Sequence, residues 1–325
     1  MRLLRGLHNP SLKEAKCVAT IGNFDGVHLG HQAIIQQVVT KAEKLGVPSV
    51  VIIFEPQPLE FFQGNKAPAR LMRFREKFQA LSSFGLDYVF CLKFDTKLSQ
   101  LSAESFVETV LVSHLKICHL VIGDDFHFGG DRKGDFSLLK TLGLMKGFSV
   151  ESTPTLVESE DNNERISSTF VRTLLAQSKF AAAQNVLGRA YSIKGRVIHG
   201  QKLGRQLGFP TANIALHRVN VAFTGVYAVK VCLQNGKQVL GVANIGVKPT
   251  VGNFLPSLEV HLLDFSSTIY GEHLSVTFCE KLRNEQRFEN IEALKEQINK
   301  DISDARCYFK NNHKALFNEL CVEKK

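Results

Sequence analysis

The chain has 325 residues, a mass of 36.2 kDa and 44% hydrophobic residues, which is enough to build two separate cores. No apolar run reaches the roughly 18 residues of a membrane span and the start lacks a secretory signal, so we expect a cytoplasmic protein without a membrane partner. The net charge of +9 suits phosphorylated substrates; the basic residues are dispersed and no RNA-reading aromatic motif is present, so we expect no nucleic-acid partner.

The first half of the chain alternates short apolar runs with helical periodicity. Helices are expected over about residues 30–45 and 74–84, and from the N-cap Ser102 to about His114. The first should bury Ile34, Val38, Ala42 and Leu45 before Gly46 stops it. The runs expected to be buried strands are Cys17–Ile21, Ser49–Phe54, Tyr88–Leu92 and Leu120–Ile122. This alternation predicts an α/β doubly wound, Rossmann-like parallel sheet with ligands at the carboxyl ends of its strands.

After about Gln177 the pattern changes to short alternating strands without helices between them. The expected strands are Ser192–Ile198, Gly225–Leu233, Val239–Ile245, Ser257–Leu263 and His273–Phe278. Asn235-Gly236 is a hairpin turn signal. Five or six such strands predict a small antiparallel β-barrel, which a terminal helix follows. The apolar face of that helix is expected to be Ile291, Leu294, Ile298, Ile302, Ala305 and Phe309. The chain thus divides into residues 1–180 and 181–325.

The seven cysteines are scattered, with neither a C-x-x-C pair nor a histidine at zinc-site spacing. We therefore expect free, mostly buried thiols in a reducing compartment.

A glycine-rich turn joins the first strand to the first helix. It carries His28 and His31, three residues apart at a helix N-terminus, where free N–H groups and the helix dipole favour an anion. Two imidazoles there can stabilise the charge that develops during displacement at phosphorus. The glycines of the turn are Gly22, Gly26 and Gly30. A glycine turn alone would indicate only a tight loop with capping histidines, whereas H-x-G-H between strand and helix favours phosphate chemistry.

Two further segments of the first half suit the same site. Ser167, Ser168 and Thr169 stand where a helix should begin, and Arg172 follows one turn later, so they could form a lid over a triphosphate. Taken alone, the three hydroxyl residues are equally a good N-cap. Aromatic residues near the end of the Ser49–Phe54 strand could pack on a flat ring, although such residues are more often part of a core.

The second half carries a basic, glycine-rich loop over residues 200–213. Its glycines would let the backbone approach phosphates, and Lys202 and Arg205 supply charge, while the chain has no Walker A motif. Thr211 and Asn213, two apart on an extended segment, present oxygens on one side and suit Mg²⁺. Without further support this loop would be an ordinary barrel corner.

Motifs in both halves resemble those of the bacterial bifunctional riboflavin kinase/FAD synthetases. In the first half these are G-N-F-D-G-V-H-L-G-H at 22–31, which is similar to the signature of the H-x-G-H nucleotidyltransferases, G-D-D-F-H-F-G at 123–129 and I-S-S-T-F-V-R at 166–172. In the second half they are G-R-Q-L-G-F-P-T-A-N at 204–213, G-V-A-N-I-G-V-K-P-T at 241–250, L-E-V-H at 258–261 and L-R-N-E-Q-R-F at 282–288. The sequence departs from the family at Gln57, where His is usual, and at Lys248, where Arg is frequent.

The resemblance implies ATP-dependent phosphorylation of riboflavin to FMN by the C-terminal half and adenylylation of FMN to FAD, with release of pyrophosphate, by the N-terminal half. We expect ATP as the co-substrate, Mg²⁺ as the metal, and a monomer or weak homo-oligomer. The implied catalytic residues are Glu259, His28, His31 and Arg172. The implied ATP-binding and phosphate-binding residues are Gly22, Phe24, Asp25, Gly26, Gly30, Ser167, Ser168, Thr169, Gly200, Lys202, Gly204, Arg205, Pro210 and Thr211. Flavin would bind Phe54, Pro56, Phe62, Asp124, Phe126 and Phe128, and the metal Thr211 and Asn213.

Two alternatives remain open from the sequence. Only one half could be active, with the other a flavin-binding or assembly module. A basic RNA-binding or nucleotide-sensing regulator could also have adopted these folds, in which case it would bind RNA in a salt-sensitive manner and turn nothing over.

Overall fold

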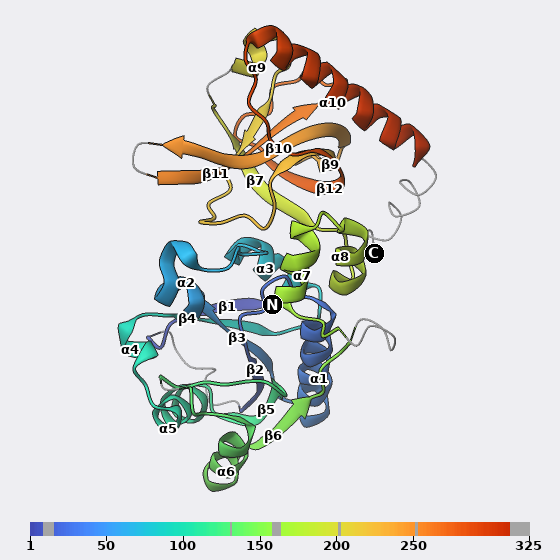
Figure 1. The fold of residues 1–325 in the computed structure, drawn as a ribbon. Helices are drawn as coiled ribbons and strands as arrows, with labels where there is room; N and C mark the ends of the chain where they lie inside the picture. Colours follow the sequence, from blue (N-terminus) through green and yellow to red (C-terminus); the bar gives the residue numbers. More distant parts are fainter. Residues whose placement is uncertain (9–15, 131, 158–163, 201–202, 251–252, 313–325) are drawn as a thin grey trace. The chain divides into compact units, whose positions relative to one another are not determined.

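The computed structural model describes residues 1–8, 16–130, 132–157, 164–200, 203–250 and 253–312 (Figure 1). The chain forms two compact units, Met1–Val171 and Arg172–Lys325. No helix in these described ranges is long and apolar enough to cross a membrane.

The first unit is built on a parallel sheet. Its strands are β1 (Arg2–Arg5), β2 (Cys17–Ile21), β3 (Ser49–Glu55), β4 (Tyr88–Lys93), β5 (Ile117–Gly123) and β6 (Ser149–Thr153), and they lie in the order β1-β4-β3-β2-β5-β6. Because β2 pairs with β3 on one side and β5 on the other, the direction in which strands are added reverses at β2. The doubly wound prediction is confirmed; β1 and β6 at the sheet edges were not predicted, since both are short and rich in polar residues.

Helices cover both faces of this sheet. They are α1 (Leu29–Leu45), α2 (Pro58–Gln63), the 3₁₀ turn η1 (Gly64–Lys66), α3 (Phe74–Ser82), α4 (Thr96–Ser99), α5 (Ala103–Phe106), the π-helical η2 (Val107–His114), α6 (Phe136–Lys146) and α7 (Ser168–Ala176), which continues into the second unit. Successive strand residues such as Val18 and Ala19 belong to two different cores, one for each face. Residues of α1 and α3 pack into the core that contains Val18. Residues of α5, η2 and α6 pack into the core that contains Ala19.

The first predicted helix is α1, and its C-terminus ends as expected. Gly46 adopts the left-handed conformation at φ 65° and donates to the carbonyls of Ala42 and Glu43. The buried stripe differs in detail, since its members are Ile35, Val38, Val39 and Ala42. Leu45, predicted to be buried, is 49% exposed because the stripe ends one turn earlier. Ser102 does cap its helix, by accepting from the N–H of Ser105.

The second unit contains a closed antiparallel barrel. Its strands are β7 (Ser192–Ile198), β8 (Ala212–Ile214), β9 (Gly225–Cys232), β10 (Gln238–Thr250), β11 (Asn253–Leu262) and β12 (His273–Arg283), which lie in the order β10-β11-β8-β7-β12-β9. The sheet closes as β9 pairs with β10. The predicted barrel is confirmed, and its sixth strand, β8, is the extended segment that contains Asn213. Two short helices, α8 (Phe180–Leu187) and α9 (Leu203–Gln206), precede β7 and β8.

The terminal helix α10 (Ile291–Asn311) packs against the barrel. Ala305 and Phe309 are buried with residues of β9 and β10, as the periodicity predicts. Ile291, predicted on the same face, is 52% exposed in the first turn of the helix. Asp301 is buried instead, because its carboxylate pairs with the Arg283 guanidinium at the end of β12, Oδ2 to Nη2, at 2.8 Å.

The cysteines within the described residues are free thiols, as predicted. Cys17 and Cys91 are buried, and burial raises the pKa of Cys17 to about 12 and that of Cys91 to about 11. The expectation that most are buried was wrong: Cys118, Cys232 and Cys279 are half-buried and Cys307 is exposed.

Candidate active sites

A cavity of about 370 Å³ opens at the carboxyl ends of the strands of the first unit. Ile21 of β2, Phe54 of β3, Gly123 of β5 and Thr153 of β6 contribute to its wall. It therefore lies on both sides of the point where strand order reverses, which is where the doubly wound fold was predicted to bind ligands.

The two histidines of the glycine-rich turn line this cavity together. His28 is the N-cap of α1, and its Nδ1 accepts a hydrogen bond from the His31 N–H at 3.4 Å. Their rings are stacked with centroids 3.6 Å apart, and the ring of Phe24 lies 4.9 Å from that of His31. A stacked pair of imidazoles, of which His28 is buried and His31 half-buried, thus stands at the positive end of a 17-residue helix.

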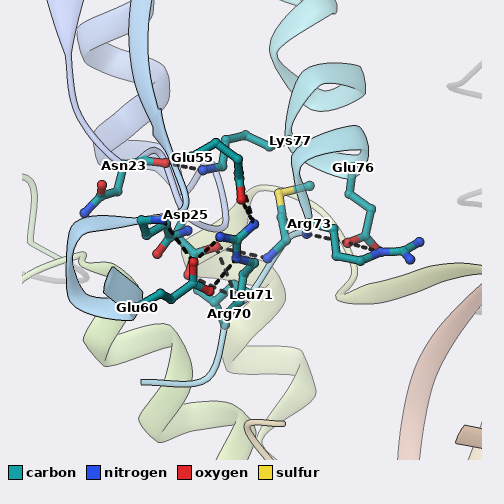
Figure 2. Close-up of polar contacts among 11 residues, drawn as sticks. Asn23, Asp25, Glu55, Glu60, Arg70, Leu71, Arg73, Glu76 and Lys77 are labelled. Atoms are coloured by element: carbon teal, nitrogen blue, oxygen red, sulfur yellow. Dashed lines mark hydrogen bonds and ion pairs between the residues drawn. The ribbon is translucent and has the colours of Figure 1, made fainter. Parts of the chain in front are cut away.

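Asp25, predicted to contact ATP phosphates, has its side chain turned to other backbone groups. The carboxylate accepts from the N–H of Leu71 at 3.0 and 3.1 Å and from that of Met72 at 3.0 Å (Figure 2). The residue is buried and does not line the cavity. A carboxylate held in this way fixes the shape of the turn.

The start of α7 closes one side of the same cavity. Ser167 caps the helix, its Oγ accepting from the N–H of Phe170 at 3.1 Å, while the hydroxyl of Ser168 donates to the carbonyl of Asp25 at 2.8 Å. Both serines line the cavity, whereas the next residue, Thr169, and Arg172, one turn further along, do not. The two predicted phosphate segments, 143 residues apart, are therefore joined by a direct hydrogen bond.

Three of the predicted flavin residues line this cavity, namely Phe54, Asp124 and Phe126. Phe128 instead lies in the core beneath it, with its ring stacked on Phe126 at 5.6 Å. The structure places Pro56 and Phe62 outside the cavity wall, and Phe62 is 63% exposed. The rings of Phe54 and Phe62 each lie 5.7 Å from that of Phe94, so an aromatic rim runs outward from the cavity.

The structure adds residues that sequence reasoning did not assign. Thr155 donates from its N–H and hydroxyl to Asp124, which holds the pKa of that carboxyl below its usual range. Arg165 pairs with Asp125, Nη2 to Oδ2, at 2.6 Å. All four residues line the cavity. Arg165 directly precedes the I-S-S-T segment, which was the available signal, whereas nothing local marks Thr155.

In the second unit two cavities of about 340 Å³ each meet at Thr211. The first is formed between the barrel and α10, with apolar walls from Val226, Val242, Leu294 and Ile298. The second contains Arg205, Pro210 and Thr211 of the basic loop together with Phe265 and Tyr270. Thr211 therefore stands at the junction of the two cavities, the first of which also carries charged side chains such as Glu259 and Arg283.

A row of polar side chains crosses three neighbouring barrel strands in the first of these cavities. Glu259 on β11 pairs in register with Asn213 on β8 and Asn244 on β10. All three side chains line the cavity, and the Thr211 hydroxyl donates to Glu259 Oε2 at 3.3 Å. Sequence reasoning had not assigned Asn244, which only the strand register brings beside Glu259.

The glycines of the 200–213 loop have different surroundings. A Cβ at Gly200 would lie 2.3 Å from Asn213 Nδ2, so the Asn213 amide packs directly on the glycine backbone. A Cβ at Gly204 would lie 2.4 Å from the carbonyl of Phe209. Lys202 lies outside the described residues, as does the side chain of Lys248.

Family models match both units. The model for FAD synthetase matches residues 11–170, and that for riboflavin kinase matches residues 187–309. A bifunctional riboflavin kinase/FMN adenylyltransferase of Escherichia coli strain K12 is 48% identical over 310 residues, which are 95% of this chain and 98% of that protein. The protein of the same name from Pseudomonas fluorescens is 53% identical over 307 residues, covering 94% of this chain and 97% of the relative.

A solved structure is similar over the same length. It is a chain from Streptococcus pneumoniae described as a macrolide-efflux protein, with a TM-score of 0.76, 26% identity, and coverage of 94% of this chain and 99% of that one. The two relatives and this structure each cover both units.

Proposed function

The chain belongs to the family of bifunctional riboflavin kinase/FMN adenylyltransferases, and we propose how its separate cavities carry the two reactions. The C-terminal unit phosphorylates riboflavin to FMN, and the N-terminal unit adenylylates FMN to FAD. The observation that carries this assignment is that the FAD synthetase match falls on the unit with the histidine-lined cavity, and the riboflavin kinase match on the unit with the Glu259 cavity.

For FAD formation, we place the triphosphate of ATP at the N-terminus of α1. A phosphate oxygen of FMN attacks the α-phosphorus, the bond to the β-phosphate breaks, and pyrophosphate leaves. His28 and His31 face this space and can donate hydrogen bonds to the oxygens whose charge increases. Ser167 and Ser168 border it from α7, and Arg172 on the same helix is assigned to the leaving phosphates.

The flavin is assigned to the aromatic side of this cavity. Phe54 and Phe126 offer flat apolar surfaces to the isoalloxazine ring, and Phe62 extends that surface beyond the cavity wall. Asp124 is kept ionised by its hydrogen bonds from Thr155, so it can accept hydrogen bonds from flavin N–H or hydroxyl groups.

For FMN formation, Glu259 is the general base. It accepts the proton of the terminal ribityl hydroxyl as that oxygen attacks the γ-phosphorus of ATP and ADP leaves. Riboflavin is assigned to the cavity beside α10, where apolar wall residues such as Val242 and Ile298 suit its ring, and the nucleotide to the cavity with Arg205 and Tyr270. The terminal ribityl hydroxyl and the γ-phosphorus of ATP would meet at Thr211, where the two cavities join.

Mg²⁺ is proposed at Thr211 and Asn213. A hydroxyl and an amide beside a carboxylate make a hard oxygen donor set of the kind Mg²⁺ takes together with phosphate oxygens and water. The described residues hold no cluster of three or more His, Cys, Asp or Glu side chains suited to a metal. When bound, the ion would neutralise charge on the transferred phosphoryl group.

The remaining expectations stay predictions. They are a cytoplasmic location, a monomer or weak homo-oligomer, and no nucleic-acid partner. The net charge of +9 is sufficiently explained by anionic phosphorylated substrates.

Chromatographic separation of the flavins formed over time from riboflavin, ATP and Mg²⁺ tests the two-site proposal. FMN should appear first and FAD should follow. With FMN as substrate, His31→Ala should abolish FAD formation; with riboflavin as substrate, Glu259→Gln should lower FMN formation by about 10²-fold or more. Each variant should leave the other reaction intact, and Glu280→Gln, an exposed strand glutamate of the barrel, should leave both intact. Equal loss of both reactions in either active-site variant contradicts two separate sites.

A further inference from the structure

A fully buried lysine lies behind the turn that carries the two histidines. Lys77, in α3, has no exposed surface, and its Nζ donates to the carbonyl oxygen of Asn23 at 2.5 Å (Figure 2). It is absent from the cavity wall and belongs to none of the recognised motifs. A buried ammonium is costly unless it is hydrogen-bonded, so this contact must compensate for the loss of water.

The segment before Lys77 is held in place from several sides (Figure 2). Arg70 forms ion pairs with Glu55, at the end of β3, and with Glu60 in α2. At the start of α3 the N–H of Arg73 donates to the Glu76 carboxylate at 2.6 Å, which caps the helix. Lys77 therefore projects from a segment that these contacts hold in place. We call this segment, residues 70–77, the platform.

This platform contacts the turn at Asn23 and Asp25, the residues on either side of Phe24. Lys77 holds the carbonyl of Asn23, and the backbone N–H groups of Leu71 and Met72 hold the carboxylate of Asp25. One contact runs from the platform's side chain to the turn's backbone, and the other from the turn's side chain to the platform's backbone. Together they fix the position and the rotation of the peptide units between them.

The turn needs such support because its backbone is strained. Phe24 has φ 46° and Val27 has φ 43°, and both residues carry a Cβ that disfavours the left-handed region. Such a residue persists only where its surroundings enforce the conformation. Without restraint the turn would relax toward an ordinary conformation and would carry His28 and His31 with it.

We propose that Lys77 is a positioning residue for FMN adenylylation, which holds the strained turn through the Asn23 carbonyl so that His28 and His31 face the triphosphate. This inference rests on the proposed function of the first unit. Burial lowers the pKa of the Lys77 ammonium, against the attraction of Asp25. Since a neutral amine still donates to a carbonyl, the positioning role does not depend on the charge.

Lys77→Met, which keeps the length of the side chain but removes the donor, tests the proposal. We expect the kcat of FAD formation from FMN and ATP to fall at least about tenfold, and the KM values for both substrates to change less than about threefold, because transition-state groups are misaligned while the binding surface remains. Riboflavin phosphorylation by the same chain should be unchanged. Arg75→Met, an exposed position in the same helix, is the matched control.

The kcat must be corrected for the folded fraction, measured by circular dichroism at the assay temperature. A loss that disappears after this correction would show a purely structural role, and a full kcat in folded Lys77→Met protein would also overturn the proposal. If Lys77→Met does not fold, Lys77→Gln serves instead: its amide is too short to reach the Asn23 carbonyl, so the same fall in kcat is expected and a full kcat overturns the proposal. If wild type and Arg75→Met make no FAD, the proposed function fails; if they do and the folded variant matches them, only the Lys77 inference fails.

Discussion

The packing of Asn213 on Gly200 allows one backbone position to probe the kinase site. A Cβ at Gly200 would lie 2.3 Å from Nδ2, 2.5 Å from Cγ and 2.7 Å from Oδ1 of Asn213. Ordinary contacts between such atoms are about 3.5 Å, so in Gly200→Ala the Asn213 amide must retreat by about 1 Å. Misplacement on that scale costs about 10²-fold in rate, which is about 2.7 kcal/mol of transition-state stabilisation.

We therefore expect Gly200→Ala to lower the kcat of FMN formation by about 10²-fold and to leave FAD formation from FMN unchanged. The assay is initial-rate chromatography of the two products with saturating ATP and Mg²⁺. Gly236→Ala is the control, because Gly236 sits in the hairpin turn at φ 84° with nothing within 4 Å, so it reports the cost of replacing a turn glycine without displacing a side chain.

The double variant Gly200→Ala/Asn213→Ala separates this mechanism from general damage to the loop. If Gly200→Ala acts by moving the Asn213 amide, the double variant should be no slower than Asn213→Ala alone. Multiplicative effects, or a Gly200→Ala kcat within twofold of wild type, would refute the reasoning.

Two further predictions concern stability and ionisation. Asp301→Asn removes the carboxylate that pairs with the Arg283 guanidinium. In denaturant titrations it should lower the free energy of unfolding of the second unit by about 3 to 5 kcal/mol. The control is Asp304→Asn, at an exposed position of the same helix, which should change this free energy by less than about 0.5 kcal/mol. Equal effects of the two variants would mean that the ion pair contributes little. Thr155→Val removes a hydroxyl that keeps the pKa of Asp124 low, so the carboxyl should titrate at higher pH by NMR. Because the folded-state pKa of Asp124 is depressed, its contribution to stability is present above the unfolded pKa of about 3.9 and is lost as the pH falls below that value. Thr155→Val should reduce this pH-dependent contribution to the free energy of unfolding. An unchanged titration midpoint would assign the low pKa to other groups.

The sequence alone was sufficient for the features whose geometry is local. H-x-G-H places two side chains at one helix N-terminus, because residues three apart in a helix lie on one face. P-T-A-N places Thr211 and Asn213 on one side of an extended segment, because side chains alternate along an extended backbone. The fold class also followed, since the hydrophobic period of 3.6 or 2 is a property of each segment by itself.

Features that depend on long-range packing came only from the tertiary structure. Strand register sets Glu259 beside Asn213 and Asn244. Phe126 and Phe128 belong to one predicted motif, yet Phe126 lines the cavity whereas Phe128 lies in the core.

The clearest case is Lys77, whose contact with Asn23 spans 54 residues of sequence. In α3 it occupies an ordinary helical position, and its neighbours along the chain contain no sign of a partner. Local patterns determine which segments are helices and strands because they reflect short-range backbone preferences. Which side chains meet across the fold is decided by how those segments pack, and that information is distributed over the whole chain.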